Sequence, residues 1–400
     1  MNPVALLFGL LVVAYLGSLL LGGRTLHGYG LPSGSEWLVL GFVLGPSVLG
    51  VASESALRAF EPLAGISMGW IALVLGTEYG YAGDRRASPR GFTVGLVCAL
   101  VSAGAVWAAV FAVARYLAHF STTEAALIGA GCGLCSCETA RYAVRWASSR
   151  AGSNQPSALR KLQDLLEDMA DTDELVPLIG VGITFAFAPS SLAVVQLTAA
   201  AWIGIAAGLG VALGLVCAML LRGMHDPRDA WPVLVGAALL GTGIAWRLGL
   251  SPLSVSFVMG VVLSITSRHA PELRRMLAHT EPAVLLPTLL LAGALVRFES
   301  SRAFLLVLGG AVIARALTRS ALGRAVAAAS GMPAPARGAL SLGFWSTGAL
   351  TTLIALGMAF RFRGPIGELV LACAFCTSVL GELVGPLSLV RALEKSEATP

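Results

Sequence analysis

The segment EAALIGAGCGLCSCETARYAVRW, residues 124–146, is apolar enough to enter a bilayer but is a poor continuous helix. Gly129, Gly131 and Gly133 weaken it, because glycine in a helix interior costs roughly 1 kcal/mol relative to alanine. The comparable stretch GFWSTGALTT, residues 343–352, is also rich in glycine and hydroxyl groups. Two such interruptions in spans of opposite orientation predict an inverted repeat with two discontinuous, crossing helices. Taken alone, either one is equally consistent with a close helix–helix contact.

The composition around these segments is that of a membrane protein. Of the 400 residues, 56% are apolar and only 12% are charged, whereas soluble domains carry roughly 25% charged residues. This excludes a water-soluble enzyme, a disordered regulator and a disulfide-stabilised secreted scaffold. The net charge of +5 is scattered between apolar runs and does not indicate nucleic-acid binding. We expect an all-α polytopic protein in contact with membrane lipid, with no enzymatic activity, no cofactor and no nucleic-acid partner.

The apolar runs define the expected spans, since a crossing helix needs roughly 20 apolar residues. About thirteen runs qualify, at about 3–22, 36–52, 61–80, 91–117, 124–146, 169–188, 191–221, 230–249, 252–267, 280–297, 302–325, 336–360 and 365–390. With the amino terminus outside, the inner loops and tail hold most of the 27 basic residues, as the positive-inside rule requires. We therefore expect a multi-pass protein of the cell (inner) membrane, with the amino terminus outside and the carboxyl terminus in the cytoplasm.

The spans form one transmembrane domain, residues 1–393, with a first repeat at about 1–190 and a second at about 225–393. Residues 394–400 are expected to be a short cytoplasmic tail, and no soluble regulatory domain is expected. The hydrophilic stretch 147–168 ends in SALRKLQDLLEDM, where apolar and charged positions alternate at helical spacing. This pattern predicts an amphipathic cytoplasmic helix that leads into the sixth span.

A buried acid at the start of the sixth span suggests an ion site, because charge at the centre of a bilayer costs on the order of several kcal/mol. Asp173 follows Thr172 directly before the run LVPLIGVGITFAF. Pro177 can loosen the helix and free a carbonyl. Carboxylate, hydroxyl and carbonyl oxygens suit a hard cation such as Na⁺ or K⁺, and a desolvated carboxyl can also exchange a proton. Asp171 is the alternative for this role.

A basic residue, Arg315, lies in the apolar run FLLVLGGAVIARAL of the eleventh span. Its long side chain either snorkels to the cytoplasmic side, or it provides a fixed positive charge that offsets carboxylates and the ends of broken helices. We assign Arg319 to the cytoplasmic end of the same span. The sequence leaves open which acid Arg315 compensates: the choices are Asp168, Asp171 and Glu138.

Several motifs resemble the monovalent cation:proton antiporter-2 family, which includes potassium-efflux antiporters and bacterial sodium/proton antiporters. LGFVLGPSVLG at 40–50 resembles the family's second-span signature, IALVLGTEYG at 71–80 the end of its third span, and LSPLSVSFVMGVVLS at 250–264 its ninth span. The resemblance extends along nearly the whole chain. It implies a core bundle together with a dimerisation bundle, and hence a homodimer.

The resemblance also places functional residues on this sequence. It puts the family's ion-binding aspartate at Asp173 and the basic residue of the eleventh span at Arg315. Thr172 stands where electrogenic members have an aspartate. The unwound motif of the fifth span corresponds to Ser136, Cys137 and Glu138. An acid therefore replaces the proline that the family pattern has at the third of these positions.

These observations predict a secondary active transporter that exchanges Na⁺ or K⁺ for H⁺ by alternating access. The alkali cation is expected at Asp173, with Thr172, Ser136 and Cys137 around it, and a single titrating aspartate makes the cycle electroneutral. The residues expected at the helix breaks are Gly131, Gly133, Ser346, Thr347 and Gly348. Two alternatives remain, namely a transporter of another solute such as an organic anion and a non-transporting sensor or scaffold derived from the same fold.

Overall fold

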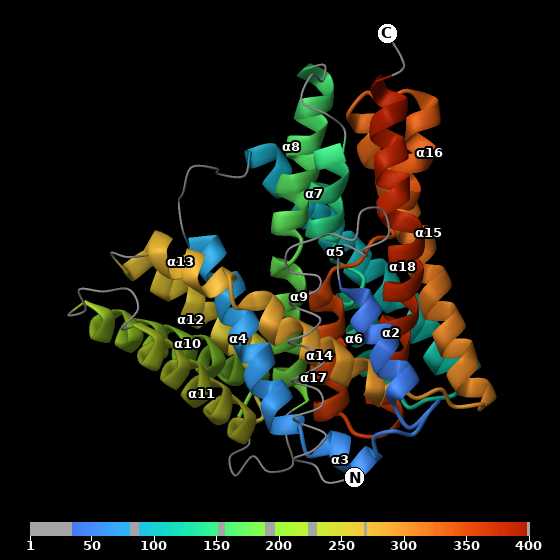
Figure 1. Ribbon diagram of the computed structural model, residues 1–400. Coiled ribbons are helices and arrows are strands. Elements are labelled where there is room, and N and C mark those ends of the chain that lie inside the picture. The colour runs from blue at the N-terminus through green and yellow to red at the C-terminus, as the bar shows by residue number, and fades with distance from the viewer. Residues whose placement is uncertain are drawn as a thin grey trace. The chain divides into compact units, whose positions relative to one another are not determined.

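The computed structural model describes residues 34–80, 88–150, 157–188, 197–222, 230–267 and 270–397. Within these ranges the protein consists of helices and contains no strand (Figure 1). The first predicted span, 3–22, lies outside them. Backbone contacts group the chain into two compact units. Unit 1 comprises the described residues within 52–86 and 178–291, and unit 2 comprises those within 34–51, 87–177 and 292–397.

Unit 1 is held together by close helix packing. Its helices are α3 (Glu54–Arg58), α4 (Glu61–Gly80), α10 (Ala199–Leu221), α11 (Ala230–Leu248), α12 (Pro252–Thr266), α13 (Ala270–Ala278) and most of α9 (Leu175–Phe187) and α14 (Glu281–Leu295). A Cβ atom added at Gly76 of α4 or at Gly260 of α12 would overlap the backbone of the other helix. Small residues at such a crossing let two backbones touch, as is typical of membrane helices.

Unit 2 contains the remaining helices. These are α2 (Ser35–Leu44), α5 (Pro89–Ala112), the π-helical turn η1 (Val113–Leu117), α6 (Thr122–Leu134), α7 (Arg141–Arg150), α8 (Ser157–Thr172), α15 (Arg302–Ala329), α16 (Ala334–Gly343), α17 (Ala349–Arg361) and α18 (Pro365–Glu397). Each unit contains helices from both of the predicted repeats. The predicted amphipathic helix is α8, which continues to Thr172, where the helix ends.

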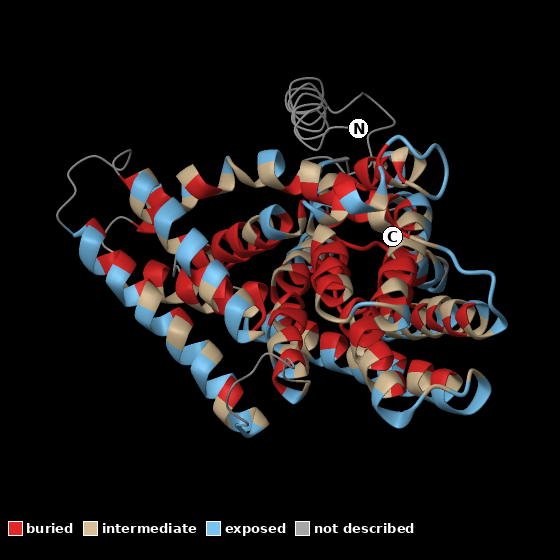
Figure 2. Ribbon diagram, turned by 90° about the horizontal axis from the view of Figure 1, so that it is seen from below, coloured by how far each residue is buried: buried red, intermediate tan, exposed pale blue. Residues whose placement is uncertain are grey.

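Five of the described helices are long and apolar enough to cross a membrane: α5 with η1, α10, α11, α15 and α18. The pair α13–α14, bent by 42°, is a sixth if it is one span. Several of the other predicted spans are divided into shorter helices, including α6 and α7, α8 and α9, and α16 and α17. In Figure 2 the buried residues form stripes along helices whose other faces are exposed. Those faces carry apolar side chains such as Met219, Leu240 and Leu317, which suit lipid.

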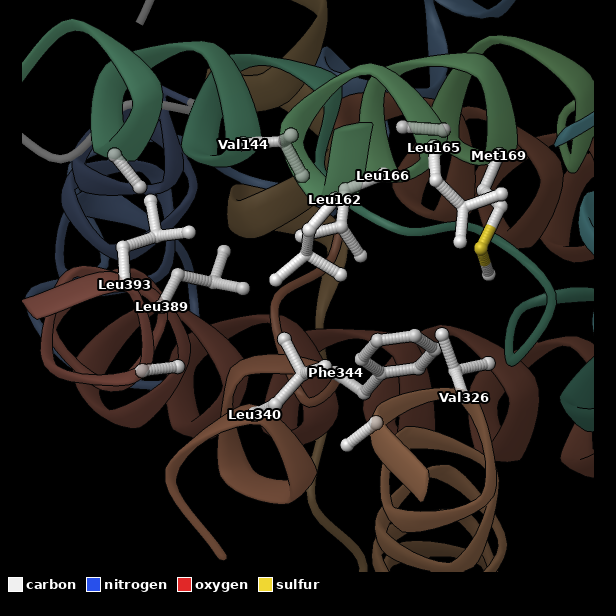
Figure 3. Packing of buried hydrophobic residues seen from close by; sticks show 14 of the residues in the cluster. Val144, Leu162, Leu165, Leu166, Met169, Val326, Leu340, Phe344, Leu389 and Leu393 are labelled. Atoms are coloured by element: carbon white, nitrogen blue, oxygen red, sulfur yellow. The ribbon is translucent and has the colours of Figure 1, made fainter. Parts of the chain in front are cut away.

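A large apolar cluster in unit 2 fixes α8 against α16 and α18 (Figure 3). Leu162 and Leu166 of α8 point toward Leu340 and Phe344 at the end of α16. Phe344 is fully buried and directly follows the last residue of α16. The cluster therefore holds the end of α16 beside α8, whose own last residue, Thr172, directly precedes the candidate aspartate.

Candidate functional site

The first helix interruption, residues 135–140, separates α6 from α7 and is buried throughout. Ser136 and Cys137 both have no exposed surface. The Ser136 hydroxyl donates to the Gly133 carbonyl at 2.6 Å, and the Ser102 hydroxyl of α5 donates to the Ser136 carbonyl at 2.8 Å. The Cys137 thiol lies 3.5 Å from the Gly133 carbonyl. In this interruption, short polar side chains therefore contact backbone carbonyls where the regular hydrogen bonds of a helix are missing.

Asp173 lies in the two-residue break between α8 and α9, and its residue is only 2% exposed. Its Oδ2 accepts the backbone N–H of Thr139, in the first interruption, at 2.9 Å. Its Oδ1 has no hydrogen-bond partner among the described residues. Pro177 has no N–H to donate to the Asp173 carbonyl one turn earlier. The site therefore offers the Oδ1 atom of Asp173, which has no hydrogen-bond partner among the described residues, and the Asp173 carbonyl, to which Pro177 cannot donate.

Arg319 of α15 connects this site to the second helix interruption, residues 344–348. It is 1% exposed. Its Nε donates to the Phe344 carbonyl at 2.9 Å, and its Nη1 to the Cys137 carbonyl at 3.0 Å. Its Nη2 donates to the Glu138 carbonyl at 3.2 Å and to the Thr139 hydroxyl. One guanidinium thus binds backbone oxygens that follow α6 and α16, and it reaches Asp173 through Thr139.

Glu138 is bound to the start of α17. Its Oε2 accepts the Thr351 backbone N–H at 2.8 Å and the Thr351 hydroxyl at 3.0 Å. A carboxylate is favourable at this position because the first N–H groups of a helix have no partner within it. A Cβ atom at Gly348, which precedes α17, would overlap the Glu138 carboxylate. Glycine is required here for close approach, with an ordinary extended backbone.

The second interruption contributes hydroxyl and backbone groups. Ser346 is fully buried and its hydroxyl donates to the Gly343 carbonyl at 3.0 Å. Thr347 is 1% exposed, and its hydroxyl has no partner among the described residues. Gly381 and Gly385 of α18 lie directly against the backbone of Trp345 and Ser346. The helix α18 therefore supports this interruption through its glycines.

Three of the predicted site residues, Gly131, Gly133 and Thr172, make contacts within or between helices. Gly131 lies against Val370, and Gly133 lies against the Ala103 carbonyl, so both occupy close helix contacts before the break. The Thr172 hydroxyl donates to the Asp168 carbonyl at 2.7 Å. The hydroxyl is thus bonded to the backbone of its own helix, because a threonine in a helix commonly donates to the carbonyl one turn earlier.

The predicted partners of Arg315 are bonded elsewhere. The Asp168 carboxylate accepts the backbone N–H and the hydroxyl of Ser88, at 2.9 and 2.7 Å, before α5. The Asp171 side chain is 44% exposed and forms ion pairs with Arg141 and Arg145. Glu138 binds α17. Arg315 itself is 5% exposed, and among the described residues it hydrogen-bonds only the Trp345 carbonyl, at 3.3 Å.

The structure therefore corrects two sequence-based interpretations of α15. Arg315 is buried, which is not the position of a snorkelling side chain, and it bonds none of the three acids. Arg319 belongs to the core of unit 2 and does not lie at a cytoplasmic helix end. The physical reason is the helical repeat, because residues four apart lie on the same face. Arg319 follows Arg315 by one turn on the buried face of α15.

Thr139 was missed by sequence analysis, because its contribution to Asp173 is a backbone N–H that any residue other than proline supplies. Arg141, at the start of α7, donates to Glu174 at 2.6 Å. This ion pair lies directly beside Asp173 in the chain and ties α7 to the α8–α9 break. The described residues contain no group of three or more His, Cys, Asp or Glu that could hold a metal ion. Any cation at Asp173 would depend on hydroxyl and carbonyl oxygens.

Solved structures include one with the same fold, the sodium proton antiporter MjNhaP1 from Methanocaldococcus jannaschii at pH 8. The TM-score is 0.65 and the sequence identity is 15%, over 100% of this chain and 99% of that chain. No family model matches the sequence, and no curated protein matches it. At this identity the likeness concerns the fold. The chain has the helical architecture of that membrane transporter.

Proposed function

We propose that the protein is a secondary active transporter that exchanges a monovalent cation, Na⁺ or K⁺, for H⁺ at Asp173. It would work by alternating access as a multi-pass homodimer of the cell membrane, with the carboxyl terminus in the cytoplasm. The observation that carries the proposal is the uncommitted Oδ1 of a carboxylate that is 98% buried between two breaks in the helices. The fold shared with a sodium proton antiporter supports it.

The chemistry of the site supports competition between the two ions. A carboxylate oxygen without a partner, deep in the protein, gains from binding either a proton or a cation. The ionised form without a ligand is the costly species, because an unpaired charge in a low-dielectric interior is strongly unfavourable. Only the loaded forms would change their access from one side to the other. This restriction couples the two fluxes.

The neighbouring charges support a single exchanging carboxylate. Arg319 is bonded to carbonyls and to Thr139, and within the part of the chain that is described none of its four hydrogen bonds goes to Asp173. Glu138 is bonded at α17 by Thr351. Asp173 has an oxygen, Oδ1, without a hydrogen-bond partner among the described residues. One cation would then exchange for one proton, and the cycle would be electroneutral.

The test is transport in proteoliposomes loaded with a pH-sensitive dye, with purified Asp173→Asn and a matched control, Asp171→Asn. Asp171 lies two residues away but is partly exposed and ion-paired at the surface of unit 2. We expect Asp173→Asn to abolish cation-driven proton flux and Asp171→Asn to retain it. Flux that persists in correctly folded Asp173→Asn would remove Asp173 from the mechanism.

Competition also predicts the pH dependence. Where Asp173 is mostly protonated, the cation concentration for half-maximal flux should rise about tenfold for each unit of falling pH, because the cation binds only the deprotonated carboxylate. Na⁺, K⁺ and Li⁺ are compared over pH 6–9, with and without a voltage clamp. A rate that changes with voltage would contradict one-for-one exchange. Absence of flux with every cation would favour a non-transporting protein, and stabilisation by organic acids alone would favour the other solute class.

A further inference from the structure

Arg315 and Arg319 lie one turn apart on α15 and have very different surroundings. Arg319 makes four hydrogen bonds. Arg315 is 5% exposed, and its single bond is the one from Nη1 to the Trp345 carbonyl at 3.3 Å. Its Nε and Nη2 have no hydrogen-bond partner among the described residues. Arg315 is therefore a buried guanidinium with unused donors.

No acid among the described residues forms an ion pair or a hydrogen bond with Arg315. The nearest candidate by sequence reasoning, Glu138, is bonded to Thr351 at the start of α17. The carbonyl of Trp345, just past the end of α16, supplies only the negative end of a helix dipole. A buried charge whose donors are unused is strongly unfavourable. A small anion bound beside Arg315 would relieve that cost.

Arg315 lines a cavity of about 20 Å³ between α15 and α18. Its walls also include Val312, Ala316, Trp345, Thr377 and Leu380. The volume is enough for one particle of about the size of a water molecule. It is too small to enclose a phosphate or a fatty-acid headgroup, whereas a monatomic anion or a water molecule fits within it.

The charge of Arg315 favours an anion over water. The Thr377 hydroxyl donates to the Cys373 carbonyl at 2.8 Å, so its proton is already used. The Trp345 carbonyl already accepts from Arg315, and the other walls are apolar. A water molecule here could accept from the guanidinium and donate to the oxygen of Thr377 or Trp345, but only an anion also offsets the charge of Arg315. A weakly hydrated halide needs only donors and an opposite charge.

We propose that the cavity beside Arg315 is a halide-binding site, with chloride as the natural ligand. The anion accepts from Nε and Nη2 of Arg315, and its charge compensates the guanidinium inside the membrane domain. This site is separate from the carboxylate of Asp173 and binds an ion of the opposite sign. Its existence does not depend on whether the chain transports cations.

The experiment measures halide binding to the purified full chain at constant Na⁺ concentration and ionic strength. Chloride or bromide replaces gluconate, and the melting temperature and the ³⁵Cl NMR linewidth are recorded. We expect a saturable rise in Tm of about 2 °C, together with ³⁵Cl broadening that bromide reverses. Absence of both effects in the wild-type chain would overturn the proposal.

Two variants locate the site. Arg315→Met removes the charge, and Ala316→Leu fills the cavity while Arg315 stays in place. Both should lose the halide-dependent rise in Tm and the NMR broadening. The control Arg302→Met changes an exposed arginine at the start of the same helix and should keep both effects. If Arg315→Met does not fold, Ala316→Leu decides, and an unchanged halide response in Ala316→Leu contradicts the assignment.

Discussion

The interruption at 135–140 and the one at 344–348 differ in what their side chains contribute. The first carries Glu138 and the backbone N–H that binds Asp173. The second carries no ionisable side chain and consists of aromatic, hydroxyl and glycine residues. Its helix, α17, has no side-chain cap of its own. It is completed by Glu138, which belongs to the first interruption.

The difference shows how the exposed helix ends are compensated. Arg319 binds carbonyls that follow both α6 and α16, the two negative ends. Glu138 binds the positive end of α17, and Asp173 binds an N–H two residues before α7. The two acids therefore have similar roles but unequal freedom. Gly348 crowds the Glu138 carboxylate, whereas Asp173 retains an oxygen without a partner.

Arg319→Met should have the largest effect, because it breaks both interruptions at once. Four buried acceptors lose their donor, and at about 1 kcal/mol each the free energy of unfolding should fall by about 4 kcal/mol, less any gain from removing a buried charge. The measurement is unfolding of the purified protein followed by intrinsic fluorescence. Arg324→Met, an exposed arginine on the same helix, is the control. Equal stability of the two variants would show that the interruptions do not depend on this clamp.

Gly348→Ala should have the second-largest effect on stability. It disrupts the contact between the two interruptions at the point where Glu138 binds the start of α17. The new methyl group displaces the carboxylate from α17 and leaves a buried charge without its donors, which costs about 3 kcal/mol. Gly309→Ala, in α15 with open space at its Cβ position, should be neutral or stabilising. Adding Glu138→Ala to Gly348→Ala removes the clash. The double variant should therefore be more stable than the sum of the two single effects predicts.

The sequence indicates the position of Asp173, because a polar pair stands directly before an apolar run and a proline follows it. The same reasoning finds the two interruptions, since glycine and hydroxyl residues are poor helix formers wherever they lie. These signals are local. They need no knowledge of which helix packs against which.

The role of Arg319 could not be read in this way. Two of its partners are backbone carbonyls about 180 residues away, and a carbonyl is present at every position of the chain. A signal was nonetheless available in the buried stripe of α15, where Ala311, Arg315, Arg319 and Gly323 recur at every fourth position. An arginine on the apolar stripe of a helix is expected to be buried, even near the end of a predicted span.

Glu138→Gln should have a smaller effect on stability. It tests whether Glu138 and Asp173 differ in that only Asp173 exchanges ions. The amide oxygen can still accept the Thr351 N–H, but the charge at the start of α17 is lost, which costs about 1.5 kcal/mol. Thermal unfolding measures this loss. Cation-driven proton flux should survive in Glu138→Gln and disappear in Asp173→Asn. A folded Glu138→Gln without flux would mean that both acids exchange ions.

The smallest effects should come from two serines that each support one interruption. Ser102→Ala removes the donor to the Ser136 carbonyl in the first, and Ser320→Ala removes the acceptor of the Trp345 indole N–H, at 2.7 Å, in the second. Each should lower the free energy of unfolding by about 1 kcal/mol. The double variant should lose the sum, because the two bonds share no atom and lie in different interruptions. A deficit well above the sum would mean that Arg319 transmits the loosening of one interruption to the other.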